Sequence, residues 1–325
     1  MIRPRKVHLD ASTVCQLKCP SCPTASGNVA KALGAGYLSF SDFKNFVDDH
    51  PGISWIELSN WGEIFLNKEL IQIMSYAYNH HVALSAGNGV NLNTVDDDVI
   101  AALVKYRFRN ITCSIDGASQ ETYSRYRQNG NFNKVIENIK KINSLKRIYH
   151  SRYPVLRWQF VVFGHNEHEI ARARRMAKEL GMSFYLKLSW DDLYGETFSP
   201  VKNTALVKKE LGLGVANRQD FFVKYKRDYM ATMCYKLWRR PQINYDGRLL
   251  GCSINYWGDY GNVFKQGFGK CWNGEKINNA RNLLMGKRPI SDDIPCLRCK
   301  IYERRKVSNR WVKEQEISLL YIKEY

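Results

Sequence analysis

Residues 7–22 read VHLDASTVCQLKCPSC, and the three cysteines in this stretch decide how the rest of the chain is interpreted. A short β-like run, residues 7–9, leads into a loop in which Cys15, Cys19 and Cys22 form a CxxxCxxC pattern. Cysteine thiolates are the usual ligands of a [4Fe–4S] cluster, which normally takes four of them. Three thiolates in one loop leave one iron open to a substrate or cofactor. The alternative is a zinc site completed by a histidine elsewhere.

Short β-like runs alternate with amphipathic helices from residue 7 to about residue 188. The expected strands are residues 7–9, 55–58, 82–86, 111–115, 156–163 and 184–188. Helices are expected at residues 133–145, where apolar residues recur at helical spacing, and at residues 167–180, which end before Gly181. Six such units predict an α/β fold, a parallel sheet curved into a partial (β/α)6 TIM-like barrel. Reactive groups in such barrels lie at the carboxyl ends of the strands.

A second group of cysteines lies near the C-terminus. Cys234 and Cys252 flank an expected β-hairpin at residues 242–250 with an Asp-Gly turn, and Cys296 and Cys299 form a CxxC. Four thiolates in two local pairs suit a closed four-coordinate site, which is either zinc or iron–sulfur. The first cysteine group favours iron–sulfur for the second.

These patterns divide the chain into a barrel, a connector, a small cysteine-bearing module and a helical tail. The expected ranges are 1–200, 201–229, 230–310 and 311–325.

Composition and charge restrict the class of protein. Hydrophobic residues make up 44% of the chain, and no run of 18 apolar residues or signal-peptide-like stretch occurs, so we expect a soluble cytoplasmic protein. Clustered cysteines in a cytosolic enzyme hold metal more often than they form disulfides. The net charge of +18 attracts anionic partners. The aromatic residues are not interleaved with the basic ones as in RNA-binding signatures, so nucleic acid is not the favoured partner.

The CxxxCxxC loop after the first strand of a partial barrel resembles the signature of the radical S-adenosylmethionine (SAM) superfamily. In that family SAM chelates the open iron, and the reduced cluster splits SAM into methionine and a 5′-deoxyadenosyl radical. That radical abstracts a hydrogen atom from the substrate. The resemblance covers roughly residues 5–190 and implies that Cys15, Cys19 and Cys22 hold the catalytic cluster. Ser21 differs from the aromatic residue that relatives often carry before the third cysteine.

The residues that the resemblance assigns to SAM binding follow the second and fourth expected strands. They are Trp61, Gly62, Glu63, Ser114, Asp116 and Arg127. The first three stand where the family has a Gly-Gly-Glu-Pro motif that meets the SAM amino group. Ser114 and Asp116 share one face of their strand and match a Ser-x-Asp-Gly pattern close to SAM. The arginine matches one that relatives carry near the SAM carboxylate.

The four C-terminal cysteines resemble the auxiliary-cluster module called the twitch domain, a shorter relative of the SPASM domain. Such modules occur in 2-deoxy-scyllo-inosamine dehydrogenase and in related enzymes that modify sugars or peptides. The resemblance implies that Cys234, Cys252, Cys296 and Cys299 hold a second [4Fe–4S] cluster. Of the two remaining cysteines, Cys113 is expected in the core. Cys271 is expected either to be buried and inert or to donate a hydrogen atom to a substrate radical.

The resemblance implies an oxidoreductase or epimerase. The expected substrate is a carbohydrate or nucleotide sugar, anionic in view of the net charge, and the expected partner is an electron donor such as flavodoxin or ferredoxin. A peptide-modifying enzyme is the alternative within the family. The alternative from another class is a nucleic-acid-binding protein that holds zinc at its C-terminal cysteines.

Overall fold

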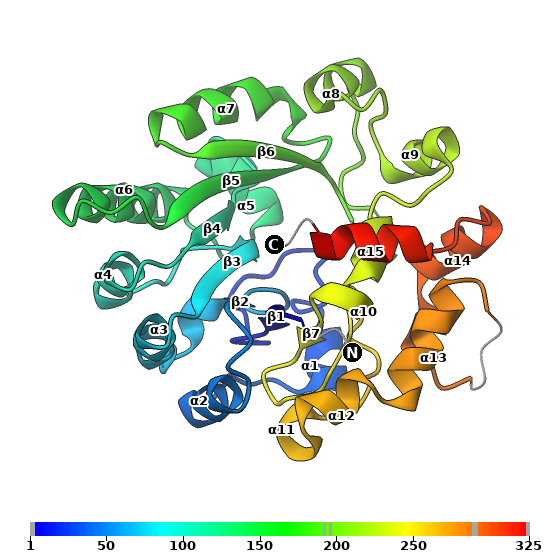
Figure 1. The fold of residues 1–325 in the computed structure, drawn as a ribbon. Helices are drawn as coiled ribbons and strands as arrows, with labels where there is room; N and C mark the ends of the chain where they lie inside the picture. The colour runs from blue at the N-terminus through cyan, green and yellow to red at the C-terminus, as the bar shows by residue number, and fades with distance from the viewer. Residues whose placement is uncertain (1–3, 191–192, 195–196, 288–291, 323–325) are drawn as a thin grey trace.

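The computed structural model describes residues 4–190, 193–194, 197–287 and 292–322. Seven strands form one parallel sheet in the order β6-β5-β4-β3-β2-β1-β7 (Figure 1). Their bounds are β1 Lys6–Leu9, β2 Trp55–Glu57, β3 Ala83–Val90, β4 Asn110–Ser114, β5 Val155–Val162, β6 Ser183–Leu188 and β7 Gln242–Ile243. The expected α/β partial barrel is confirmed, since all six expected strands are present in sequence order.

Helices cover the outer side of the curved sheet. Those of the barrel are α1 Asn28–Leu33, α2 Phe40–Asp49, α3 Leu70–Asn79, α4 Asp97–Lys105, α5 Gln120–Tyr126, α6 Phe132–Ile148 and α7 Ile170–Glu179. Figure 1 shows α2, α3, α4, α6 and α7 following one another around the outside of the strands. The helical spacing of residues 133–145 is confirmed by α6, whose Val135, Ile139 and Ile142 are buried. Gly181 follows α7 with a φ of +65°, a conformation that glycine adopts without strain.

Short helices make up most of the C-terminal third. They are α8 Thr204–Leu211, α9 Arg218–Tyr225, α10 Lys236–Arg239, α11 Val263–Gln266, α12 Phe268–Trp272, α13 Glu275–Leu284, α14 Lys300–Val307 and α15 Glu314–Ile322. Helices α8 and α9 lie near the end of β6, whereas the segment with the second group of cysteines lies on the side of β1 and β7 (Figure 1).

The expected hairpin is present, but its first arm also extends the barrel sheet. The Asp-Gly turn forms, with Gly247 at φ +87° and an antiparallel bridge between Ile243 and Leu249. The first arm, β7, pairs in parallel with β1, where His8 lies opposite Gln242. Without β7, strand β1 would leave a row of backbone groups unpaired at the edge of the sheet. The sequence predicted six strands because β7 is only two residues long.

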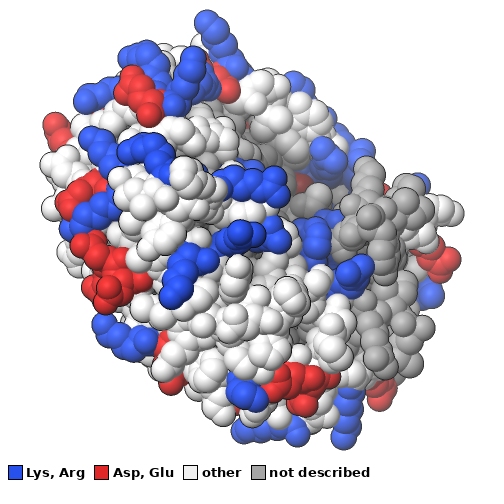
Figure 2. Space-filling view, turned by 60° about the vertical axis from the view of Figure 1, so that its left-hand side comes forward, with Lys and Arg blue, Asp and Glu red and all other residues white. Residues whose placement is uncertain are grey.

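Charged side chains are spread over the surface. Figure 2 shows Lys and Arg scattered over one face with Asp and Glu among them. Among the helices in the described part of the chain, none combines the length and apolar character that crossing a bilayer requires.

Replacing Trp158 tests how much core packing against β5 contributes to the free energy of unfolding. It is fully buried on β5, and its indole nitrogen donates to the carbonyl of Ile115 at 2.8 Å. We expect Trp158→Ala to lower the free energy of unfolding by about 3–5 kcal/mol, because it leaves a cavity and an unpaired carbonyl. Urea denaturation checks this, with Ile148→Ala as the control. Ile148 is 65% exposed, so equal losses in the two variants would contradict this packing.

Candidate iron–sulfur sites

The loop with the first three cysteines crosses the opening of the barrel at the carboxyl ends of the strands. It begins where β1 ends, and Leu17 and Cys19 are buried against Tyr126, Val161 and Phe163. Tyr126 ends α5, and Val161 lies on β5, so the loop reaches from one side of the curved sheet to the other. Cys15 and Cys22 pack against the same cluster. The structure therefore brings the three cysteines to the edge of the sheet where barrels place reactive groups.

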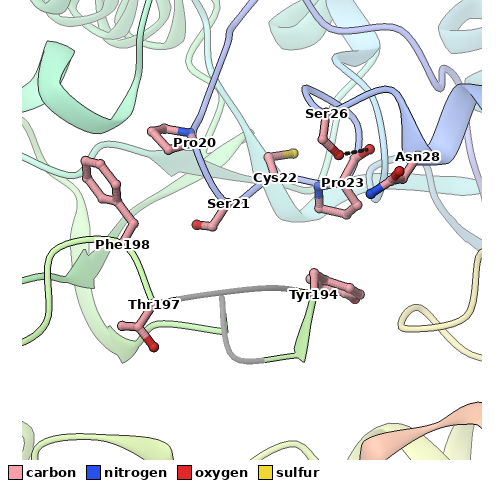
Figure 3. A pocket seen from close by; sticks show the side chains of 9 residues that line it. All are labelled: Pro20, Ser21, Cys22, Pro23, Ser26, Asn28, Tyr194, Thr197 and Phe198. Carbon is pink, nitrogen blue, oxygen red and sulfur yellow. Dashed lines mark hydrogen bonds between the residues drawn. The ribbon is translucent and has the colours of Figure 1, made fainter.

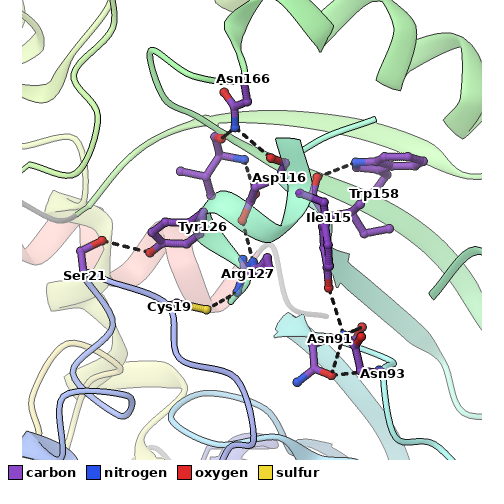
Figure 4. A network of polar contacts seen from close by, with 12 residues as sticks. Cys19, Ser21, Asn91, Asn93, Ile115, Asp116, Tyr126, Arg127, Trp158 and Asn166 are labelled. Carbon is purple, nitrogen blue, oxygen red and sulfur yellow. Dashed lines mark hydrogen bonds and ion pairs between the residues drawn. The ribbon is translucent and has the colours of Figure 1, made fainter. Parts of the chain in front are cut away.

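A polar network fixes the middle cysteine (Figure 4). The Nη1 of Arg127 donates to Cys19 Sγ at 3.7 Å, and its Nε donates to Asp116 Oδ2 at 2.7 Å. The other Asp116 oxygen accepts from the backbone nitrogen of Val161 at 2.7 Å. Asn166 donates to the carbonyls of Asp116 and Val161 at 3.1 and 2.9 Å. Burial raises the pKa of Asp116, although the Arg127 charge opposes that shift.

A second network supports the first cysteine. Asn91 donates from its side chain to Cys15 Sγ at 3.8 Å and from its backbone to Glu63 Oε2 at 2.6 Å. The backbone nitrogen of Glu63 in turn donates to the carbonyl of Val14, next to Cys15, at 2.8 Å. Burial raises the pKa of Glu63 to about 7, opposed by the backbone N–H groups of Asn91 and Phe65. Glu63 thus joins the cysteine loop, at Val14, to the segment after β3, at Asn91.

Trp61 and Gly62 lie against the cysteine loop from the β2 side. A Cβ on Gly62 would come within 2.5 Å of the carbonyl oxygen of Ser12, so this close approach needs glycine. Trp61 is only 8% exposed, and its indole nitrogen forms no hydrogen bond with any described residue. Its carbonyl accepts from the hydroxyl of Thr24, two residues after Cys22.

Ser114 lies farther along the inner face of the sheet. It is 6% exposed, and its hydroxyl occupies the space that a Cβ on Gly89 would need. Of the six residues assigned to SAM binding, Asp116 and Arg127 therefore meet at Cys19, and Gly62 and Glu63 contact the loop backbone. Trp61 is tied to the loop through Thr24, and Ser114 does not take part in these networks. Their roles in SAM binding stay predictions.

Burial makes Cys15 and Cys19 weaker acids than a free thiol. It raises the pKa of Cys15 to about 12 and that of Cys19 to about 11, with the Arg127 charge opposing the shift at Cys19. Metal binding must therefore displace these protons, as it does at thiolate sites in general.

An open pocket adjoins Cys22 (Figure 3). One wall comes from residues 20–28 and the other from the segment after β6, including Tyr194, Thr197 and Phe198. The lining side chains that the structure describes are hydroxyls, an amide, prolines, aromatic rings and the cysteine, and no charged residue is among these described ones. Ser21 Oγ hydrogen-bonds Tyr126 Oη at 3.0 Å, and the Tyr126 ring packs behind the lining residue Phe198, with ring centres 5.6 Å apart.

The four C-terminal cysteines line one cavity in the second module. Cys234, Cys252, Cys296 and Cys299 share it with apolar side chains that include Leu237, Ile254 and Leu284. Tyr260 Oη lies 3.4 Å from Cys296 Sγ. Burial raises the pKa of Cys234 to about 11 and that of Cys299 to about 12. Among the described residues, no three His, Cys, Asp or Glu side chains form a group that could hold a metal ion as they stand, at this cavity or at the N-terminal loop.

The other two cysteines lie outside both groups. Cys113 is fully buried in the core on β4. Cys271 is 4% exposed on α12, and its thiol donates to Gln266 Oε1 at 3.4 Å. The neighbouring Phe268 packs edge-on against Phe46 of α2, with ring centres 6.1 Å apart. Cys271 is therefore enclosed by packing, and its role as a hydrogen donor stays a prediction.

Residues 234–300 match the SPASM family, described as an iron–sulfur cluster-binding domain. The match begins at Cys234 and ends one residue after Cys299, so it contains all four cysteines of the cavity. None of the curated proteins compared with the chain matches it.

Solved structures share the fold over almost the whole chain. Streptococcus suis SuiB is 13% identical with a TM-score of 0.65, over 93% of this chain and 71% of SuiB. SuiB bound to the precursor peptide SuiA is 11% identical with a TM-score of 0.66, over 92% of this chain and 70% of that SuiB chain. The structure of anSMEcpe with bound AdoMet is 15% identical with a TM-score of 0.61, over 92% of this chain and 87% of anSMEcpe.

The fold and the C-terminal match define a partial-barrel protein with an iron–sulfur cluster-binding domain. At these identities the solved structures establish the fold, and the family match establishes the domain. The family match bears out the expected SPASM-type module, and the shared fold bears out the expected partial barrel.

The buried Glu63 gives the metal-free protein a specific pH dependence. The pKa of Glu63 is about 7 in the folded protein, whereas in the unfolded chain its pKa lies near the ordinary value of 4.5. Between these values the folded state binds more protons, so its stability falls as the pH rises and levels off above pH 7. The loss attributable to Glu63 is about 3 kcal/mol. We expect Glu63→Gln to flatten this slope in urea denaturation of reduced, chelated protein from pH 4.5 to 8.

The exposed Glu179→Gln variant, on α7, serves as the control and should keep the wild-type slope. A Glu63→Gln variant with an unchanged slope would show that Glu63 ionises normally in the folded protein.

Proposed function

We propose that this protein is a radical SAM enzyme with a catalytic [4Fe–4S] cluster at Cys15, Cys19 and Cys22 and an auxiliary [4Fe–4S] cluster in the SPASM domain. The observation that carries the proposal is the three-cysteine loop, held at the carboxyl edge of the barrel by hydrogen bonds to two of its sulfurs. Three thiolates satisfy three irons of a cubane and leave the fourth for SAM.

The donor sets fit the proposed groups. The N-terminal loop offers three sulfurs, and the C-terminal cavity offers four in apolar surroundings. When bound, the N-terminal cluster and SAM supply the 5′-deoxyadenosyl radical. Arg127 and Asn91 donate hydrogen bonds to cysteine sulfur and so stabilise the thiolate form. Asp116 orients Arg127, and the buried packing of the loop excludes water.

Lys187 supports an anionic substrate. It lies on β6 opposite Val161, and partners in a parallel register face the same side of the sheet. Val161 packs on Leu17 and Cys19, so Lys187 rises from the face that carries the cysteine loop. Within the described chain it forms no ion pair, and its ammonium lies 4.2 Å from the centre of the Trp190 ring. Burial, with the nearby charge of Arg218, lowers the pKa of Lys187 to about 7. An anionic group beside it would restore the charged form.

The substrate that these features favour is a carbohydrate with an anionic group, such as a nucleotide sugar, which the enzyme oxidises or epimerises. The hydroxyl, amide and aromatic side chains around Cys22 suit a neutral polar ring, and Lys187 suits a phosphate or carboxylate. A peptide substrate is the second candidate, because one structure of similar fold, SuiB, is bound to a precursor peptide.

The net charge of +18 suits an acidic electron donor such as flavodoxin or ferredoxin in a reducing cytoplasm. The basic surface would speed the encounter with such a partner, and added salt would slow it.

Metal content and SAM cleavage test the proposal directly. We expect anaerobically reconstituted protein to hold about eight irons and eight sulfides. With a strong reductant it should convert SAM into 5′-deoxyadenosine and methionine. Cys19→Ala should abolish this reaction and remove about four irons, because the N-terminal cluster loses one of its three thiolate ligands. Replacing Cys296 and Cys299 should remove the other cluster.

Cys113→Ala is the control and should change neither iron content nor SAM cleavage, because Cys113 lies in the core. Stoichiometric zinc with binding of RNA or DNA would contradict the proposal. S-adenosylhomocysteine as the main product would indicate methyl transfer instead.

A substrate panel tests Lys187. We expect sugar phosphates and nucleotide sugars to stimulate 5′-deoxyadenosine formation more than the uncharged parent sugars do. Lys187→Met should raise the concentration needed for half-stimulation by roughly ten- to a hundredfold, which corresponds to a lost charge-assisted hydrogen bond. Lys187→Arg should keep part of the effect. Equal stimulation by uncharged sugars, whatever residue stands at position 187, would rule out this role.

A further inference from the structure

A row of aromatic rings connects the two cysteine sites. The ring of Trp61 meets that of Tyr256 edge-on at 5.4 Å between centres, and Tyr256 meets Trp257 at 5.3 Å. Tyr194 lies beside the row, 6.1 Å from Trp61 and 5.9 Å from Tyr256. These four residues come from the loop after β2, the segment after β6 and the SPASM domain. We call Trp61, Tyr256 and Trp257 the aromatic bridge.

Each end of the aromatic bridge is attached to a cysteine segment. At the barrel end, the carbonyl of Trp61 accepts from Thr24, which is joined to Cys22 through Pro23. At the other end, the indole nitrogen of Trp257 donates to the carbonyl of Pro295 at 2.9 Å, and Pro295 precedes Cys296. A continuous series of bonded or contacting groups therefore runs from Cys22 to Cys296.

A second contact joins the loop after β2 to the SPASM domain. The side chain of Asn60 donates to the carbonyl of Ser253, next to Cys252, at 3.3 Å. Asn60 also accepts from the side chain of Asn88 at 3.3 Å, at the carboxyl end of β3. Loops at the strand ends are thus fixed to the SPASM domain directly beside the aromatic bridge.

Packing alone does not explain Trp61. Its indole nitrogen is buried without a hydrogen-bond partner among the described residues, which costs free energy that a phenylalanine or leucine would not incur. A large π system is nevertheless placed between the two sites, in edge-to-face contact with the next ring.

We infer that the aromatic bridge is the route by which an electron passes between the iron–sulfur centres at the two cysteine sites, an inference that rests on the proposed function. The electron leaves the reduced C-terminal centre, which is oxidised by one unit, and reaches the N-terminal centre, which is reduced by one unit. No bond is made or broken and no proton moves. The electron comes from a low-potential donor of the flavin or iron–sulfur class. Tunnelling through protein weakens steeply with the gap between π systems or metal centres, and the rings shorten each gap.

The test follows electron redistribution in the full chain, reconstituted anaerobically and without SAM. A light flash with a deazaflavin donates less than one electron per chain, and freeze-quenched EPR spectra follow its distribution between the two centres. Variants lacking the cysteines of one site supply the reference spectrum of the other. We expect Tyr256→Leu and Trp257→Leu to lose the fast redistribution phase, and Tyr256→Phe to keep it. The midpoint potentials of both centres should stay at their wild-type values in all three.

Tyr78→Leu is the matched control, since Tyr78 is a ring on α3 that is 41% exposed and outside the aromatic bridge. It should keep the fast phase. A fast phase in Tyr256→Leu and Trp257→Leu equal to that of the wild type, with both centres present, would overturn the bridge and leave the proposed function standing. A wild-type protein that holds no iron–sulfur centre would overturn both.

Discussion

The buried ion pair between Arg127 and Asp116 is the interaction on which the arrangement of the barrel opening depends. Asp116 is fully buried and joins the end of β4 to β5 through Val161, while Arg127 extends from the end of α5 to the sulfur of Cys19. A buried pair of this kind stabilises the fold only when its remaining hydrogen-bonding groups are also satisfied. Here the second carboxylate oxygen accepts from the backbone nitrogen of Val161, and the Nη1 of Arg127 donates to Cys19. The contacts that stabilise the two buried charges therefore also fix the position of the cysteine loop.

The sequence predicted those parts of the fold and site that depend on local pattern. Strand and helix alternation, the Asp-Gly turn and the two cysteine groups are all short-range signals, and the structure confirms the elements. The contacts that set the geometry are long-range. Asn91, for example, is 76 residues from Cys15, and nothing in its local sequence marks it as a partner of sulfur. The same holds for Asn166 and for the aromatic rings around Ser21.

Two of the residues assigned to SAM binding, Gly62 and Trp61, differ in how well the motif predicts their contacts. Gly62 is needed because the loop after β2 touches the backbone of Ser12, a reason that any chain with this approach would share. Trp61 stands at the first glycine of the Gly-Gly-Glu-Pro motif that the resemblance implies, and its ring contacts that of Tyr256 in the SPASM domain. The side chain at this position therefore makes a contact with the C-terminal module that the motif itself does not predict.

The pairing of β7 with β1 also has a consequence for synthesis of the chain. The backbone nitrogens of His8 and Asp10 donate to carbonyls at residues 241 and 243, more than two hundred residues later. Strand β1 leaves the ribosome before β7, so its edge stays open until residues 241–243 have been made. The cysteine loop follows that strand directly, so its support is completed late. For the proposed N-terminal cluster, a finished site is available only after the segment that contains Cys234 has also emerged.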